Sequence, residues 1–326
     1  MTDSTAVRTS WSAPDLMALT FPEPRWAVPG IVSEGLNLLV SPPKTGKSWM
    51  SLNLAVAISS GGMALGRIPV EGGSVLYLAL EDTPRRLQQR MRTVLGAEPP
   101  PPALTFVNAC PTLDEGGDTM IAGWLKHHAD ARLVIIDVFA KIRGTSSSRS
   151  GSAYEADYQA TGAIKRLADD SGVAMLVVHH TRKAAADDFL ATVSGTNGIA
   201  GSADTLLVLS RSRTTADAML QITGRDVEEA EHAMKFDAAN GQWSLLEGPA
   251  SDYGLGDTRK AILDYLREMG AGTPKDIAED LKLSRDLVRK TLNQMAKDGQ
   301  IDTDGHGLYM SLDGVTPVPA VTEGIW

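Results

Sequence analysis

The stretch NLLVSPPKTGKSWMSL, residues 37–52, decides the fold of this chain. It carries most of the pattern G-x-x-x-x-G-K-[ST], in which backbone N–H groups at a helix N-terminus bind phosphate oxygens. Gly46, Lys47 and Ser48 fill the last three positions, but Ser41 stands where the first glycine is expected. An apolar run precedes the loop and an apolar helical segment follows it, as the motif requires. The sequence therefore predicts a nucleotide site at this loop.

The whole loop is expected to contact the nucleotide, through Ser41, Pro42, Pro43, Lys44, Thr45, Gly46, Lys47, Ser48 and Trp49. Lys47 would reach the β- and γ-phosphates and the Ser48 hydroxyl would ligate Mg²⁺, so ATP and Mg²⁺ are the predicted cofactors. The two prolines have no N–H to donate, and they stiffen the loop entrance. Because Ser41 is small and needs only a compatible backbone turn, we expect Ser41→Gly to leave ATPase activity nearly unchanged.

Short apolar runs alternate with helix-length segments along the chain, at residues 36–40, 74–80, 104–107, 133–136, 173–178 and 205–210. Apolar runs without strict alternation are typical of strands buried on both faces of a parallel sheet. They predict an α/β fold with a doubly wound, mostly parallel sheet. A helix is predicted over 84–95, with Thr83 as its N-cap. Later segments predict a closing antiparallel set with a hairpin turn at Asn240-Gly241.

Carboxylates follow two of the predicted strands, at the edge where open α/β sheets bind ligands. Asp137 is the expected partner of Ser48 in holding the metal. Glu81 is the expected general base that orients or deprotonates water, with Asp82 as the second candidate. Either of these two residues could instead cap the helix that begins near Thr83.

Two histidines, His179 and His180, end the run at 173–178. Adjacent residues of a strand point to opposite faces, so both cannot serve one site. One of them could hydrogen-bond the γ-phosphate and report its presence to the following loop. A metal bound by the pair is the weaker alternative.

Four segments in this order, LLVSPPKTGKSWMSLNLA, VLYLALEDTPRRL, LVIID and LVVHHTRKAA, resemble RecA-like P-loop ATPases of the RepA-type plasmid and phage replicative helicase group. The resemblance covers about residues 29–246. It implies a RecA-like core with ATP sites at the subunit interfaces of a homo-oligomeric ring, commonly hexameric. It also implies Lys47 and Ser48 on the phosphates and Mg²⁺, Glu81 as catalytic base, Asp137 as the Walker B acid, and His180 as the sensor.

A ring of this kind needs an arginine from the neighbouring subunit to stabilise the charge of phosphoryl transfer. Arg211 and Arg213 follow the run at 205–210. Arg225 falls near the position where ring helicases carry a Lys-x-Arg pair, although Thr223 replaces the lysine. Solvated surface arginines are the alternative for all three.

Contacts with single-stranded DNA are expected from two Ser/Gly-rich loops that would face the central channel. The loop at 140–157 contributes Lys141, Arg143 and Arg149, and the loop at 181–204 contributes Arg182 and Lys183. The same composition also suits mobile surface loops.

Helical periodicity returns after residue 256, with start signals at Thr273-Pro274 and Ser284 and a short hairpin-like piece at 300–312. Three helices and a hairpin predict a winged helix-turn-helix. Its third helix offers the cations Arg285, Arg289, Lys290 and Lys297, of which the first three are the expected DNA contacts. Acidic residues crowd the same helices, so docking to a protein is nearly as well supported.

The expected domain organisation has five parts: an N-terminal arm at 1–28, a RecA-like core at 29–247, a linker at 248–256, a winged helix-turn-helix at 257–312, and a disordered tail at 313–326.

The composition limits the kind of DNA contact and the cellular location expected for the protein. Its 326 residues carry a net charge of -9, so DNA contacts must come from local basic clusters. Cys110 is the single cysteine, and the chain shows neither a signal peptide nor an apolar run of transmembrane length. A cytoplasmic protein without membrane contact is expected.

These observations favour an ATP-hydrolysing, ring-forming motor that acts on DNA in replication, with a primase or an initiator protein as a further partner. The alternative is an ATP-switched DNA-binding regulator or recombination accessory ATPase that does not unwind DNA. A scaffold without ATPase activity is disfavoured because the lysine, the serine and both carboxylates are present.

Overall fold

The structure, a computed structural model, describes residues 10–21, 23–144, 153–180, 197–211, 217–248, 250 and 257–312. Several predicted features lie outside these residues: the basic residues Arg149, Arg182, Lys183 and Arg213, and the tail at 313–326.

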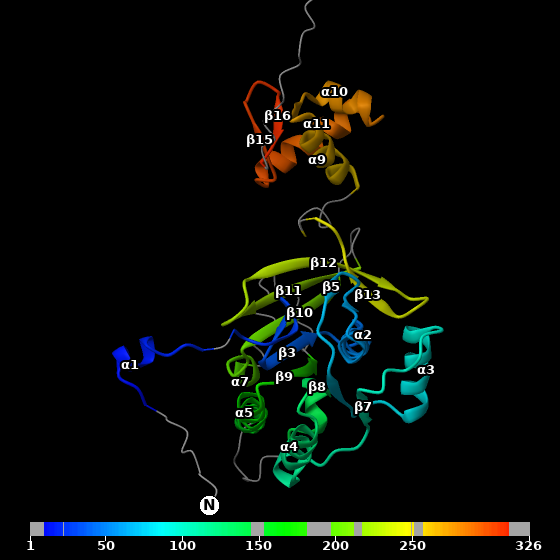
Figure 1. Cartoon of the computed structure of the whole chain (residues 1–326). Helices are drawn as coiled ribbons and strands as arrows, with labels where there is room; N and C mark the ends of the chain where they lie inside the picture. The colour runs from blue at the N-terminus through cyan, green and yellow to red at the C-terminus, as the bar shows by residue number, and fades with distance from the viewer. Residues whose placement is uncertain are drawn as a thin grey trace, which may run out of the picture.

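A nine-stranded sheet forms the centre of the molecule, in the order β13-β12-β11-β10-β3-β9-β8-β6-β7 (Figure 1). Six neighbouring strands are parallel: β3 Gly35–Ser41, β6 Ser74–Ala79, β7 Leu104–Val107, β8 Ala131–Asp137, β9 Ala174–His180 and β10 Thr205–Arg211. Three strands extend the sheet in antiparallel fashion: β11 Ala218–Gly224, β12 Ala230–Asp237 and β13 Gln242–Leu245. The predicted fold class, a doubly wound and mostly parallel α/β sheet, is confirmed.

Helices cover both faces of the parallel strands. One face packs against α2 Lys47–Ser60 and α3 Pro84–Leu95. The other face packs against α4 Gly117–His127, α5 Ala153–Ser171, α7 Asn197–Ala200 and the 3-10 turns η1 Leu113–Glu115 and η2 Phe139–Lys141. Strand residues alternate between the two cores: in β8, Leu133 and Ile135 face α2, whereas Val134 and Ile136 face α5. The even or odd position of a residue on a strand therefore decides which side its side chain occupies.

Local signals in the sequence account for the ends of several elements. Thr83 caps α3, because its hydroxyl accepts a hydrogen bond from the Arg86 N–H at 3.3 Å. The β12–β13 hairpin turns at Asn240-Gly241, where Gly241 takes a positive φ of 68° that favours glycine. Both features agree with the predictions from sequence.

The N-terminal segment differs from its prediction as an arm over 1–28. A short exposed helix, α1 Ala13–Met17, is followed by β1 Trp26–Val28, which pairs with β2 Val32–Ser33. Ala27 and Val28 are buried in the core on the α2 face. The core therefore begins at Trp26, because burial of this apolar pair requires the backbone pairing that β2 supplies. A second small ladder joins β4 Met63–Ala64 to β5 Ile68–Pro69.

Residues 257–312 form a unit with its own apolar core, drawn in orange and red in Figure 1. Its helices are α9 Asp257–Met269, α10 Pro274–Asp280 and α11 Arg285–Lys297. Its sheet has the order β14-β16-β15, from β14 Ala271–Gly272, β15 Ile301–Thr303 and β16 Tyr309–Ser311. Thr273 and Ser284 cap α10 and α11 through their hydroxyls. The unit thus has the three helices and the hairpin that the sequence predicts.

Across the described ranges, no helix has the length and apolar character needed to cross a membrane.

Candidate functional site

The loop between β3 and α2 has a backbone that explains the departure from the phosphate-loop pattern. Positive φ angles occur at Lys44, 65°, and at Gly46, 108°. Ser41, in contrast, is the fully buried last residue of β3 and lies beside His180 of β9. A Cβ atom at Gly46 would lie 2.9 Å from the ring of Trp243. The loop therefore requires glycine at position 46 and accepts serine at position 41.

Lys47 folds back over the loop that precedes it. Its ammonium group donates hydrogen bonds to the Ser41 carbonyl at 2.8 Å, the Ser41 hydroxyl at 2.8 Å and the Pro42 carbonyl at 3.1 Å. Burial lowers the pKa of Lys47 to about 8, although the nearby carboxylates of Asp137 and Glu81 oppose this shift. Ser41 thus gives the lysine an acceptor that a glycine lacks.

Replacing Ser41 with glycine is expected to change ATP turnover by less than about threefold, which corresponds to about 0.7 kcal/mol of activation free energy. The variant removes one of the acceptors of Lys47 and keeps both carbonyls. Steady-state ATPase rates of Ser41→Gly and Ser41→Ala measure the effect, and the alanine variant isolates the hydroxyl from backbone freedom. A loss beyond about tenfold in both variants would contradict the expectation.

Asp137 ends β8 on the α2 face, at the N-terminus of α2. Its buried carboxylate accepts a hydrogen bond from the Tyr77 hydroxyl at 2.8 Å and another from the Ser48 side chain. Burial raises the pKa of Asp137, and these two hydrogen bonds partly offset the rise. Tyr77 was missed at the level of sequence. A buried tyrosine hydroxyl needs a partner, and its place in an apolar strand was the available signal.

The oxygen donors at this point fit the predicted Mg²⁺. Ser48 and Asp137 come from different elements and are already in hydrogen-bond contact, and both are hard oxygen ligands. A Mg²⁺ bound with a nucleotide usually takes only one or two protein ligands. No group of three or more His, Cys, Asp or Glu side chains suited to a metal occurs within the described residues. His179 contacts Phe139 whereas His180 lies beside Glu81, so the structure does not bring the two histidines to one metal.

Glu81 and His180 face each other across the edge of the sheet. Glu81 Oε2 lies 3.9 Å from His180 Nε2, and the two side chains are 51% and 40% exposed. Burial and the neighbouring Lys47 lower the pKa of His180, although the carboxylates of Glu81 and Asp137 oppose this shift. Asp82 is only 8% exposed, and its carboxylate accepts hydrogen bonds from Arg86 and Arg90. The geometry favours Glu81 over Asp82 as the group that can act on water.

His179 lies on the opposite face from His180, as the alternation of strand residues predicts. Its ring meets the edge of Phe139 with centroids 6.1 Å apart. Burial lowers its pKa to about 4. His179 is therefore a neutral packing residue beside η2, outside the cluster around Lys47.

The β12–β13 hairpin closes over the start of α2. The Trp243 indole N–H donates to the Gly46 carbonyl at 3.1 Å, and Asn53 bonds to both the Trp243 N–H and the Gly241 carbonyl. Trp49 packs against Gly241 and lies 6.1 Å from Phe236. The side chain of Trp49, expected at the nucleotide, is therefore engaged with this hairpin. Sequence reasoning missed this support because Gly46 and Trp243 are 197 residues apart.

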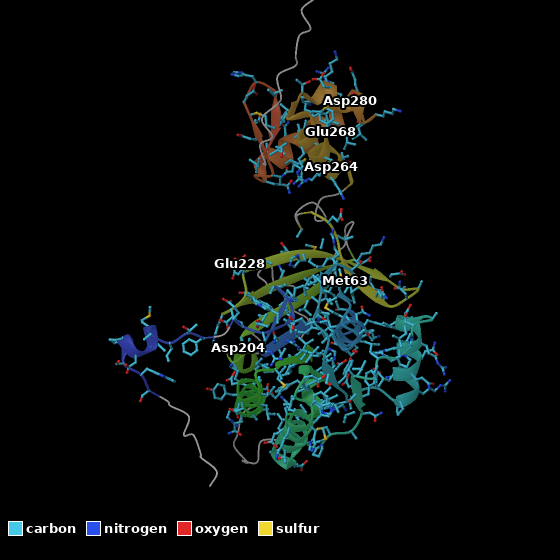
Figure 2. The ribbon with its side chains drawn as sticks, viewed as in Figure 1. Met63, Asp204, Glu228, Asp264, Glu268 and Asp280 are labelled. Atoms are coloured by element: carbon cyan, nitrogen blue, oxygen red, sulfur yellow. The ribbon has the colours of Figure 1, made fainter. Side chains whose placement is uncertain are left out.

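The candidate arginines Arg211 and Arg225 lie at opposite ends of the strands of the sheet. Arg211 ends β10 on the same edge as the phosphate loop. Arg225 follows β11 and lies beside Asp204, which bonds to Leu36 at the beginning of β3. Figure 2 labels Asp204 and Glu228, which mark this far end. At about 3.3 Å per strand residue, Arg225 lies about 16 Å along the sheet from Ser41, beyond the reach of its side chain.

The expected DNA contacts are spread over two parts of the chain. Lys141 is exposed after β8, whereas Arg143 forms an ion pair with Asp157 of α5. On α11, the three cations expected at DNA, Arg285, Arg289 and Lys290, are exposed, as is Lys297 at the end of the helix. The structure does not bring the two groups together into one site.

Nucleotide binding is expected to weaken and to take up protons as the pH rises through about 8. Lys47 has a lowered pKa, so its charged form is complete only below that value, and bound phosphate favours the charged form. Isothermal calorimetry at about pH 8.5, in buffers of different ionisation enthalpy, measures the proton uptake. Lys47→Arg stays protonated and should abolish it. Equal apparent enthalpies in all buffers for the wild-type protein would contradict this assignment.

Comparison with known proteins gives two independent findings. Over residues 2–186, more than half of the chain, the sequence matches a family model described as an AAA domain. The structure is similar to a solved ATPase domain, with a TM-score of 0.55 and 14% identity over 66% of this chain and 85% of that one. It is also similar to a solved DnaB-like replicative helicase, whose structure was described together with the interactions of that helicase with primase. That match has a TM-score of 0.52 and 13% identity, over 67% of this chain and 58% of that one. The likeness confirms the RecA-like fold.

Proposed function

The chain belongs to the AAA domain family, and on that premise we propose that it is a P-loop ATPase whose hydrolysis drives a ring-forming motor on DNA, of the replicative helicase type. One observation carries the proposal. The ends of four separate strands bring five side chains together at one edge of the sheet: Lys47, Ser48, Asp137, Glu81 and His180.

Each of these residues has a chemical task at that edge. Bound Mg²⁺ and ATP would supply the transferable phosphoryl group and neutralise part of its charge. The backbone at Gly46 and the N-terminus of α2 bind phosphate oxygens, and Lys47 balances their charge. Ser48 and Asp137 would hold the metal. Glu81 orients the attacking water and accepts its proton, while His180 donates a hydrogen bond that reports phosphate occupancy.

Assembly into a ring is supported by the position of Arg225. This arginine is exposed and too far from the phosphate loop of its own chain, so any role at an ATP site would be at the site of a neighbouring subunit. One structural neighbour is an ATPase domain and the other a DnaB-like replicative helicase, and the motif set resembles the RepA-type group of plasmids and phages. A hexamer acting on single-stranded DNA, with a primase or initiator as partner, is the form we propose.

The C-terminal unit favours a contact with DNA duplex in the same protein. Its three helices and hairpin fit a winged helix, and Arg285, Arg289 and Lys290 are exposed on α11. In the second candidate function, this unit docks on DNA and ATP only switches assembly. The exposed cations of α11 are the observation that supports it.

A forked-DNA strand-displacement assay separates the two functions. The motor displaces the strand only with hydrolysable ATP, and Lys47→Ala is the matched inactive variant. DNA-stimulated hydrolysis without displacement would support the switch instead. Electron microscopy with a non-hydrolysable ATP analogue tests the ring, because dimers or open filaments would contradict it.

A further inference from the structure

The turn that carries Glu81 is fixed by contacts of its neighbours. Leu80 donates its N–H to the Asp137 carbonyl at 2.7 Å, and Asp82 donates its N–H to the Ala79 carbonyl at 3.3 Å. Among the described residues, the Glu81 carboxylate pairs only with His180, at 3.9 Å. Its direction is therefore set by the turn and not by its own contacts.

Two arginines of α3 hold this turn through Asp82. Arg86 donates to the Asp82 carboxylate at 3.2 Å and to the Glu81 carbonyl at 3.3 Å. Arg90 donates to the other carboxylate oxygen of Asp82. Arg90 is 24% exposed and Arg86 is 56% exposed, so Arg90 makes the better shielded pair. Pairs shielded from solvent hold their geometry more firmly than exposed ones.

Arg90 also contacts the helix that begins at the phosphate loop. Its guanidinium group lies 5.5 Å from the centre of the Trp49 ring, within the range of a cation–π contact. Trp49 follows Lys47 and Ser48 directly and is itself held by Phe236 and Gly241. A planar guanidinium can stack on a ring and bond to a carboxylate at once, which an ammonium group does less well.

We propose that Arg90 is a positioning residue that sets the direction of Glu81 relative to the phosphate loop, by bridging Asp82 and Trp49. This inference rests on the proposed role of Glu81 as general base. Displacement of a catalytic group by about 1 Å can cost about 100-fold in rate. The bridge fixes the spacing between the elements that carry Lys47 and Glu81. Loss of the Arg90 side chain therefore lowers the rate of the chemical step and leaves the affinity for nucleotide unchanged.

The first experiment compares single-turnover ATP hydrolysis and nucleotide affinity in Arg90→Ala, Arg90→Lys and Arg85→Ala. Arg85 is exposed on the same helix and makes no ion pair within the described ranges, so it is the matched control. We expect Arg90→Ala to lose about 10- to 100-fold in rate, with affinity for a fluorescent ATP analogue within about twofold. Arg90→Lys should recover part of the loss, and Arg85→Ala should match wild type. Thermal unfolding followed by circular dichroism checks that each variant is folded.

The second experiment repeats Arg90→Ala in a Glu81→Gln background. If Arg90 acts through Glu81, the double variant is no slower than Glu81→Gln alone. A further loss of the same size in the double variant, or an Arg90→Ala rate equal to wild type, overturns the inference while Glu81 keeps its role. Wild-type turnover in Glu81→Gln overturns the general-base assignment itself and removes the premise. If Arg90→Ala is unfolded, Arg90→Lys and Asp82→Asn undergo the same comparison.

Discussion

Replacing Glu81 with glutamine is expected to lower ATP turnover by at least about 100-fold and to leave nucleotide affinity within about twofold of wild type. The amide keeps the size of the side chain and its place beside His180 but cannot accept a proton. Steady-state hydrolysis with saturating DNA measures the first quantity, and titration with a fluorescent ATP analogue measures the second.

Glu98→Gln is a suitable control for this experiment, because Glu98 is exposed in the loop that follows α3. It should behave as wild type. Loss of binding together with turnover in Glu81→Gln would indicate a structural role for Glu81. Unchanged turnover would return Asp82 to consideration, although its carboxylate is bound by two arginines.

Replacing Arg225 with alanine is expected to lower turnover by about 1,000-fold, because an arginine supplied across an interface stabilises the transition-state charge. The free subunit should still bind nucleotide, since Arg225 lies at the far end of the sheet from its own phosphate loop. The decisive measurement is the ATP turnover of a mixture of the two inactive variants, Glu81→Gln and Arg225→Ala. Where Arg225 of a Glu81→Gln subunit meets the site of an Arg225→Ala subunit, every catalytic group is present.

Activity in such mixtures should therefore rise well above that of either variant alone. Arg85→Ala again provides the matched arginine control. If mixtures never exceed the sum of their parts while Arg225→Ala alone is inactive, the arginine does not act across the interface. If Arg225→Ala is fully active, Arg211 becomes the next residue to test.

Features that depend on neighbouring residues in the chain could be predicted from the sequence. The apolar runs located the parallel strands because burial on both faces leaves no room for polar side chains, as at Leu133 and Val134. Thr83, Thr273 and Ser284 were identified as caps because a cap needs only a hydroxyl beside the first turn. The place of Glu81 at the same edge of the sheet as Lys47 could be predicted, because open α/β sheets bind ligands at the carboxyl ends of their strands.

Features that join distant parts of the chain could not be predicted. Tyr77 and Asp137 are 60 residues apart, and nothing in their local sequence indicates that they meet. The same holds for Asp204, which bonds to the Leu36 N–H across 168 residues and pairs with Lys165 of α5. The arm prediction failed at β1 for this reason: Ala27 and Val28 gain a buried position only when the sheet exists.

The contact between Trp243 and Gly46 sets a minimum size for any working fragment of this protein. The matched family region ends at residue 186 and contains every residue of the phosphate-loop motif. The indole that bonds to the Gly46 carbonyl, and the hairpin that packs on Trp49, come from residues beyond it. A fragment cut at the end of that region would keep the motif and lose one side of the loop. We therefore expect a fragment that binds nucleotide on its own to extend at least as far as Leu245, the last residue of β13.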